Sequence, residues 1–378
     1  MLNLCITCDH ELYFGENYVS EEDVFIKPSY ALCKVLEKHN VRATFFADVC
    51  SVFRYRSLNM LDYPNQVERQ LTEIVQRGHD VQLHVHPHWY HSEYRNGCWS
   101  FDRERYCIHS FGFEHTGAAG LTADRIVSDG KAYLETLLHP VRSSYQCIAF
   151  RAGGLCLQPE RELLKVLKKQ GIHIDSTVVK GGYAHTDVHT YDYLHTPAAV
   201  NWWINPETGL GTAAEADWTR NVFEVPIGSL TRKPRALLLY LRNKLAFVVH
   251  EPARGSYMPI TTATHASASP LKRISRRIYT AKIILSFDAY CAKVLISVLR
   301  TYLSTYDCAQ YDYFVSIICH PKILREAHFR EIDAFLQQVI NAFPQIRFTT
   351  LQQVYDHLRA GGVENARRQK PATPRPRC

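Results

Sequence analysis

Short apolar strands alternate with amphipathic helices along most of the chain. Apolar runs and period-two alternation predict strands at residues 1–8, 41–48, 81–86, 147–151, 172–175, 223–226, 313–319 and 347–349. Apolar positions three and four apart predict helices at residues 27–39, 65–77, 122–139, 159–170, 324–343 and 351–359. Because strands that alternate with helices build a parallel sheet or barrel, we expect an α/β fold.

Two regions interrupt this rhythm. Residues 89–120 are rich in aromatic and charged side chains, and residues 180–218 show no periodicity. The second region continues into two candidate basic amphipathic helices, at residues 234–249 and 271–303. We therefore interpret residues 1–360 as one domain with insertions at about 89–120 and 180–305. Residues 361–378, basic and proline-rich, are expected to form a disordered tail.

Positive charge is concentrated in one part of the chain. The 378 residues carry a net charge of +7. Residues 232–282 alone contribute about +10, because Glu251 is their only acidic residue. Such a concentration indicates an anionic partner, such as a membrane surface or a lipid-linked substrate, or a solvated basic face. No nucleic-acid partner is expected, because no recognised binding module is present.

The N-terminus and the cysteines suggest a compartment. No window reaches about 18 uninterrupted apolar residues, and Met1 leads into the first strand without a charged-then-apolar leader. We therefore expect a cytoplasmic location, or a peripheral one at the inner face of the membrane, with the 12 cysteines reduced. Cys5 and Cys8 form a C-x-x-C, but residues three apart in a strand face opposite sides, which favours buried core thiols.

Histidines gather at the end of the strand at residues 81–86. Alternation with Val81, Leu83 and Val85 places His84 and His86 on one strand face. Pro87 ends the strand, so His88 follows just past it. His84 with either His88 or His86 is therefore a candidate pair of metal ligands, whereas His79 and His10 are expected to pack or to support the ligands. The aromatic region after this strand is then a substrate wall or a self-packed excursion.

Two carboxylates follow the first strand. Asp9 and Glu11 stand at i and i+2 after an apolar run, so their side chains point to the same side at the end of the strand. Carboxylate and imidazole ligands together suit Zn²⁺ or a similar divalent ion with an open position for water. The sequence thus predicts a metal site assembled from the start of the chain and the histidine-rich strand.

Several segments, in order along the first 320 residues, resemble motifs of the polysaccharide deacetylase family (carbohydrate esterase family 4, the NodB-homology family). The resemblance implies a distorted (β/α) barrel with large loop and helical insertions. The segments are Ile6-Thr7-Cys8-Asp9-His10-Glu11, Val41-Arg42-Ala43-Thr44-Phe45-Phe46, Gly78-His79-Asp80-Val81 running to His84 and His88, Phe150-Arg151-Ala152-Gly153-Gly154, Asp175-Ser176-Thr177 and Ile317-Ile318-Cys319-His320-Pro321.

The resemblance also implies a reaction, the hydrolysis of an N-acetyl group on an amino sugar. Glu11, His84 and His88 would bind the metal, with zinc as the expected ion. Asp9 would take a proton from water, and His320 would protonate the leaving amine. Arg151 would hold Asp9 ionised, unless it forms only a structural ion pair. Asp175 would orient His320.

The chain departs from the family pattern at two places. His10 separates the two carboxylates, a variant also found in relatives that hydrolyse other amides. Ala152-Gly153 stands where many relatives have a proline. An amidohydrolase acting on a non-sugar amide or ureide, and a non-catalytic binding protein, therefore remain alternatives. The basic stretch favours a nucleotide- or lipid-linked sugar as the substrate.

Overall fold

The computed structural model describes residues 1–12, 20–113, 120–186, 188–231, 243 and 282–362. Its centre is a 9-stranded sheet in the order β10-β11-β7-β6-β3-β2-β1-β14, with β15 also paired to β1. The strands are β1 Leu2–His10, β2 Thr44–Asp48, β3 Asp80–Val85, β6 Ala149–Ala152, β7 Ile174–Asp175, β10 Trp202–Ile204, β11 Val222–Glu224, β14 Tyr313–Cys319 and β15 Ile346–Thr349.

Strand β1 is an interior strand of the sheet and is buried along its whole length. It pairs in parallel with β2 on one side and with β14 on the other. Cys8 is level with Cys319, and Asp9 is level with Phe46. Because these strands run in the same direction, the residues that follow them meet at one edge of the sheet.

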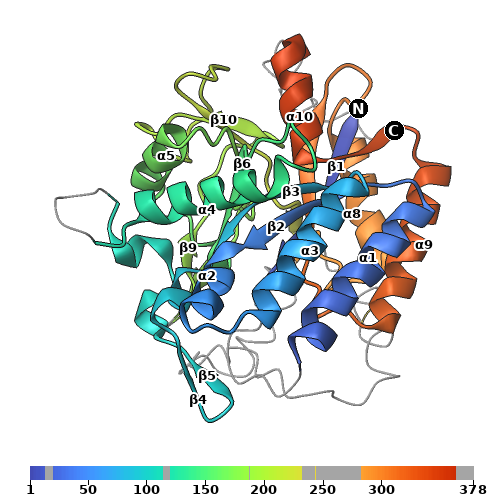
Figure 1. Ribbon diagram of the computed structural model, residues 1–378. Helices are drawn as coiled ribbons and strands as arrows, with labels where there is room; N and C mark the ends of the chain where they lie inside the picture. The colour runs from blue at the N-terminus through green and yellow to red at the C-terminus, as the bar shows by residue number, and fades with distance from the viewer. Residues whose placement is uncertain (13–19, 114–119, 187, 232–242, 244–281, 363–378) are drawn as a thin grey trace, which may run out of the picture.

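The sheet curls until its two ends approach each other (Figure 1). Ile227, just beyond β11, forms parallel bridges to Val179 on one side and to Ser316 of β14 on the other. A further parallel bridge joins Ser286 to Ile318. These short bridges complete the curl where regular strands are absent, and they bring the segment at residues 286–288 beside the end of β14.

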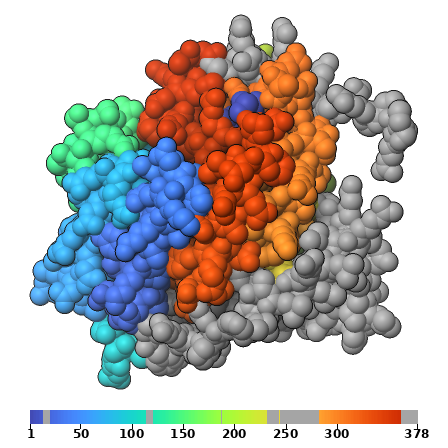
Figure 2. All heavy atoms as spheres, turned by 90° about the vertical axis from the view of Figure 1, so that its right-hand side faces the viewer, coloured from blue at the N-terminus to red at the C-terminus, as the bar shows by residue number. Residues whose placement is uncertain are grey.

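Helices cover the outer face of the curled sheet (Figure 1). Figure 2 shows α1 against α9, with α8 on the other side of α9, so the first and last parts of the chain pack together. The helices are α1 Lys27–Lys38, α2 Val49–Ser57, α3 Asp62–Gln76, α4 Ala123–Leu138, α5 Glu160–Lys169, α8 Ala292–Thr305, α9 Glu326–Ala342 and α10 Leu351–His357. None of these described helices is long and apolar enough to cross a bilayer.

The insertions contain short elements of their own. Residues 87–111 form short 3₁₀ turns around a hairpin of β4, Glu93–Arg95, and β5, Cys98–Ser100. The region after residue 180 contains the hairpin of β8, Tyr183–His185, and β9, Thr190–Asp192. Trp202 and Trp203 form part of β10 and are buried in the core.

Three expectations about elements were wrong or lie outside the described residues. Of the helix expected at residues 271–303, residues 271–281 lie outside the described residues, and β13, Lys282–Ile284, pairs with β12, Ser229–Thr231, so the described helix begins at Ala292. Helix α2, which was not expected, follows β2 directly and is capped by Asp48, whose side chain accepts from the Cys50 amide at 3.2 Å. The basic helix at 234–249 and the tail after residue 362 lie outside the described residues.

The described cysteines are all free thiols. Cys5 and Cys8 belong to different core clusters, so the C-x-x-C consists of buried thiols on opposite sides of β1, as expected.

Candidate active site

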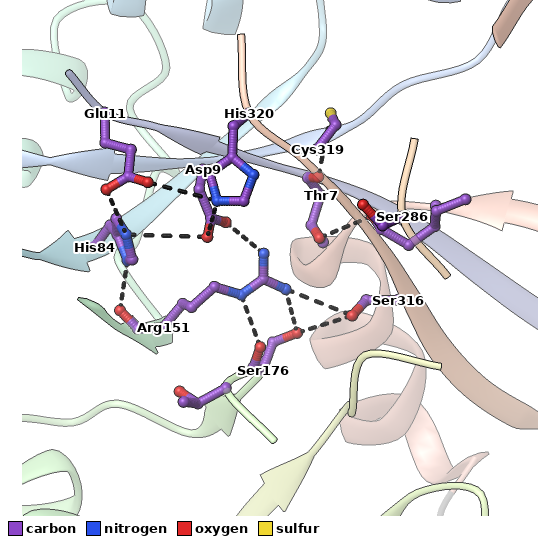
Figure 3. Close-up of polar contacts among 12 residues, drawn as sticks. Thr7, Asp9, Glu11, His84, Arg151, Ser176, Ser286, Ser316, Cys319 and His320 are labelled. Carbon is purple, nitrogen blue, oxygen red and sulfur yellow. Dashed lines mark hydrogen bonds and ion pairs between the residues drawn. The ribbon is translucent and has the colours of Figure 1, made fainter. Parts of the chain in front are cut away.

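Six polar side chains converge at the carboxyl edge of the sheet, and Figure 3 shows five of them: Asp9, Glu11, His84, Arg151 and His320. Strand β1 brings Asp9 and leads to Glu11, while β3 brings His84 and leads to His86. Arg151 comes from β6, and His320 follows β14. All but His320 are at most 5% exposed. The structure therefore gathers Asp9, Glu11, His84, Arg151 and His320 where the sequence placed them.

Arg151 and Asp9 form a buried ion pair. The guanidinium Nη1 donates to Asp9 Oδ1 at 2.5 Å, and Nε and Nη2 donate to the Ser176 carbonyl and hydroxyl at 2.7 and 2.9 Å. Phe46 lies under the guanidinium at 4.4 Å. Burial would raise the pKa of Asp9, but Arg151 and then His84 and His320 outweigh it and lower that pKa. Asp9 is thus held ionised.

His84 is oriented as a ligand by the backbone. Its Nδ1 lies 2.7 Å from the carbonyl oxygen of Arg151, which can only accept, so Nδ1 carries the proton. Nε2 is then left with its lone pair. Among the described residues it makes no hydrogen bond, and it faces Glu11 Oε2 at 3.6 Å and Asp9 Oδ2 at 4.0 Å.

His86 completes the group with Glu11 and His84. Its Nε2 contacts Glu11 Oε2, and the ligand atoms of these three residues lie within 4.8 Å of one another. One carboxylate oxygen and two imidazole nitrogens are donors that zinc and similar divalent cations prefer. The residues therefore fit a metal ion. Asp9, Glu11 and His320 form a second group of the same compactness.

His88 does not join Glu11 and His84, contrary to the ligand set that the resemblance implied. Pro87 opens a 3₁₀ turn, Pro87–His91, in which His88 is buried. The ring stacks on Tyr106 with centroids 5.1 Å apart and an interplanar angle of 17°. Burial lowers the pKa of His88 well below its usual range. The alternative weighed from the sequence, His86, lies in the group with Glu11 and His84 instead.

Asp288, rather than Asp175, orients His320. Asp288 Oδ2 accepts from His320 Nδ1 at 2.7 Å, and Oδ1 accepts from the His320 amide at 3.0 Å. Nε2 therefore points to the carboxylates, 3.5 Å from both Asp9 Oδ2 and Glu11 Oε1. Burial lowers the pKa of His320, but Asp288 and then Asp9 and Glu11 raise it above its usual value.

Asp175 faces another way. Its carboxylate accepts from the Thr177 hydroxyl at 2.7 Å and from the Thr177 amide at 3.1 Å, and the buried Glu224 stands level with it on β11. Asp175 is thus a structural residue of the β7 end. Asp288 was missed because residues 286–288 were assigned to a helix, although the apolar run before them is typical of a strand ending in an acid.

Lys322 and Asp48 also support the site and were not expected. Lys322 Nζ donates to Glu11 Oε1 at 2.8 Å and to the Leu12 carbonyl at 3.0 Å. Burial raises the pKa of Glu11, but His86 and then Lys322 lower it well below its usual range. Asp48 Oδ1 accepts from the His86 amide at 3.1 Å, which fixes the backbone of that ligand. Only the closeness of Lys322 to His320 in the sequence hinted at its position.

His10 and His79 are packing histidines, as expected. His10 Nε2 lies 2.9 Å from Gln70 Oε1, and its ring packs against Phe25 at 4.1 Å. His79 Nδ1 accepts from the Ala43 amide at 3.1 Å. Burial lowers the pKa of both histidines to about 4. Neither ring belongs to the metal-binding groups described above.

The convergent side chains open into a cavity of about 230 Å³. Its floor is polar, and its walls come from both insertions and from the loops after β6 and β14. It is lined by Asp9, Glu11, His86, Tyr106, Gly154, Leu155, His189, Tyr191, Ile318, His320, Lys322 and Ile323. A polar floor within aromatic and aliphatic walls is typical of a small-molecule site.

Comparisons with known proteins agree on the architecture. No protein-family model matches the chain, and no curated protein sequence matches it. Among solved structures, a candidate glycoside hydrolase/deacetylase from Parabacteroides distasonis is similar with a TM-score of 0.53 and 12% identity, over 95% of this chain and 71% of that one. A candidate polysaccharide deacetylase from Mycobacterium smegmatis has a TM-score of 0.45 and 13% identity, over 100% of this chain and 95% of that one. The allantoinase PuuE has a TM-score of 0.45 and 12% identity, over 95% of this chain and 90% of that one.

At these identities the likeness concerns the fold. The first of these structures resembles this chain in fold over 95% of its residues. The chain has the (β/α) barrel-like α/β fold of the polysaccharide deacetylases, as the sequence motifs implied.

Proposed function

We propose that this protein is a metal-dependent hydrolase that removes an N-acetyl group from an amino sugar. One observation carries the proposal. An ionised carboxylate paired with Arg151, an imidazole paired with Asp288 and a compact carboxylate–imidazole group all face the same cavity. Amide hydrolysis needs a base, an acid and an electrophile in this arrangement.

Glu11, His84 and His86 are the residues that would hold the metal, and Zn²⁺ is the ion that this donor set suits best. A bound divalent cation would supply Lewis-acid polarisation of the amide carbonyl. Lys322 engages Glu11 Oε1 and so leaves Oε2 to face the two imidazoles.

Asp9 acts as the general base. Arg151 occupies Oδ1, so Oδ2 is the oxygen that faces His84 and His320. Oδ2 accepts the proton from the water that attacks the acetyl carbon. The Arg151 pair also keeps Asp9 from shifting toward the cavity.

His320 acts as the general acid. Because Asp288 accepts from Nδ1, Nε2 is the nitrogen that presents a proton to the cavity. The scissile C–N bond breaks as Nε2 protonates the departing nitrogen, so the products are acetate and a free amine. The raised pKa of His320 favours its protonated form.

The walls support a sugar as the substrate. Tyr106, His189 and Tyr191 offer ring faces and polar edges, which suit a pyranose better than a featureless acyl chain. The basic stretch at residues 232–282 supports an anionic carrier on the sugar, such as a nucleotide or lipid phosphate. The small volume of the cavity keeps a non-sugar amide or ureide as a second candidate.

The test combines metal analysis of the purified protein with two activity assays: acetate release from N-acetylated nucleotide sugars, lipid-linked sugars and chitooligosaccharides, and C–N bond hydrolysis of small ureides. We expect bound zinc and acetate release from at least one sugar. Asp9→Asn should lower release by about 10²-fold or more while metal stays bound. Loss of metal in that variant would make Asp9 a ligand and contradict its role as base.

A matched pair of variants tests the ligand set. His86→Ala should lower zinc affinity by at least about 10-fold, whereas His88→Ala should leave zinc bound. The reverse result would restore His88 as the ligand. If the protein holds no metal, and if His320→Ala changes no activity because wild type turns over none of these substrates, the protein is a binding protein instead.

A further inference from the structure

Three segments of the chain meet tightly at Gly154, beside the catalytic cavity. Gly154 has a φ of 62°, in the region that favours glycine. A Cβ at this position would lie 2.4 Å from Tyr106 Cε1 and 2.7 Å from His189 Cδ2. Both insertions therefore reach the same glycine, Tyr106 from the first and His189 from the second.

Tyr106 links the metal-binding group to His189. Its ring centroid lies 5.4 Å from that of His86 and 5.1 Å from that of His88, on which it stacks. Its hydroxyl lies 3.2 Å from His189 Nε2, a hydrogen-bond distance. The two side chains thus form one continuous wall that begins beside a ligand and ends at the mouth of the cavity.

Two thiols fix this wall from behind. Cys107 Sγ donates to the Val188 carbonyl at 3.3 Å, and the Thr190 amide donates to Cys156 Sγ at 3.4 Å. Tyr106 and Val188 belong to the same buried cluster as the two cysteines. The segments on either side of Tyr106 and His189 are therefore held in place, so the wall has a defined position rather than a loose one.

Leu155, Ile318 and Ile323 add an aliphatic part to the lining of the cavity. The cavity is partly open, and its volume of about 230 Å³ is smaller than the roughly 300–1,000 Å³ of pockets for drug-sized ligands. A space of this size suits one sugar ring with its acetamido group better than several rings of a polymer.

We propose that Tyr106 and His189 are specificity-determining residues that admit a single terminal N-acetylated sugar ring and exclude the internal rings of a polysaccharide. The inference rests on the proposed function and names its substrate class. The Tyr106 ring lies against one face of the sugar, and the hydrogen-bonded Tyr106–His189 edge contacts its hydroxyl groups. The carrier of the sugar leaves through the mouth of the cavity.

The first test is regioselectivity. Zinc-loaded protein is given tetra-N-acetylchitotetraose, and mass spectrometry locates the deacetylated ring. Wild type should modify only a terminal ring, whereas Tyr106→Ala and His189→Ala should also modify internal rings. For N-acetylglucosamine, both variants should raise KM about 10-fold with kcat nearly unchanged.

Tyr106→Phe, which keeps the ring, should restore terminal selectivity. Tyr183→Phe, on an exposed tyrosine of β8, is the control.

The second test separates this inference from the proposed function. Binding of N-acetylglucosamine is measured by NMR titration in the Asp9→Asn background, where turnover is not needed. We expect Tyr106→Ala and His189→Ala to weaken binding about 10-fold. If binding weakens in this way but wild type releases acetate from no substrate, the deacetylase activity is overturned and the sugar subsite is supported. Three results would overturn the subsite. Wild type could deacetylate internal rings, both variants could keep the KM and the binding of wild type, or wild type could fail to bind N-acetylglucosamine. His189→Ala serves alone if Tyr106→Ala fails to fold.

Discussion

At the scale of single residues, Gly153 leaves the room that His86, the proposed metal ligand, occupies. A Cβ on Gly153 would lie 2.4 Å from the Val85 carbonyl oxygen and 2.8 Å from His86 Nδ1. The absence of a side chain there lets the end of β6 approach the end of β3. The motif position at which the family often has a proline is therefore used here to make room for an imidazole.

Gly153→Ala should consequently lower the affinity for zinc by at least about 10-fold, because the methyl group displaces His86 from Glu11. Competition with a chromophoric chelator measures this affinity. Gly120→Ala is a suitable control, since a Cβ there meets no atom within 4 Å. Equal affinities in the two variants would show that His86 is not a ligand.

Mutation can distinguish the roles of Asp288, which contacts His320, and Asp175, which was expected to orient it. Asp288→Asn replaces the acceptor of the Nδ1 proton, so we expect kcat to fall about 10²-fold with zinc still bound. Asp175→Asn should reduce the free energy of unfolding and leave kcat of the folded enzyme nearly unchanged, because Asp175 contacts Thr177 and not His320. Steady-state kinetics and urea unfolding give the two readouts. Equal kcat values in Asp288→Asn and wild type would contradict the orienting role.

At the scale of elements, helix α4 shows how closely the outer layer packs on the sheet. Gly130 faces inward, where a Cβ would lie 2.8 Å from Leu83 Cδ1 of β3 and 3.0 Å from Val49 Cγ2 of α2. The histidine-bearing strand β3 is therefore supported from behind by a helix that has no room for an extra methyl group.

Gly130→Ala tests this packing. Alanine favours a helix over glycine by about 1 kcal/mol, but overpacking a core costs about 1–3 kcal/mol. We expect a net loss of roughly 1 kcal/mol in the free energy of unfolding, measured by urea denaturation. Ser128→Ala, at a half-buried position of the same helix, should be neutral or slightly stabilising. A Gly130→Ala protein more stable than wild type would show that the interface can relax.

The elements that the sequence predicted well are those buried on both faces. Strands such as β1 and β14 read as apolar runs because helices or other strands cover them on every side. The alternation of apolar and polar residues could not decide whether His86 or His88 lies beside Glu11. That depends on the turn after Pro87 and on the stacking of His88 against Tyr106. Asp288 reaches His320 only through the bridge of Ser286 to Ile318, a contact between distant segments.

At the scale of the whole molecule, buried neutral histidines make the fold sensitive to acid. His79 accepts from the Ala43 amide through Nδ1, so protonation of Nδ1 would break a backbone contact. The pKa of His79 and of His10 is lowered to about 4 by burial, against about 6.5 in an unfolded chain. The unfolded state therefore binds these protons first, and stability falls as pH drops from about 6.5 toward 4.

We expect thermal melting temperatures to be steady above about pH 7 and to fall progressively below pH 6.5. His79→Gln should flatten this decrease, because one of the histidines whose pKa is lowered by burial no longer titrates. His185→Gln, on the exposed strand β8, should leave the slope unchanged. A melting temperature independent of pH down to about 4.5 would contradict the role of the buried histidines.

The distance along the chain between Glu11 and Lys322, 311 positions, has a consequence for biosynthesis. A ribosome makes the two carboxylates long before the strand that pairs beside them and the imidazole that faces them. A nascent or truncated chain that stops before β14 therefore leaves one edge of the buried strand β1 without its partner, and it lacks residues of the candidate site. Quality-control factors would meet every such shorter chain as an unfinished product.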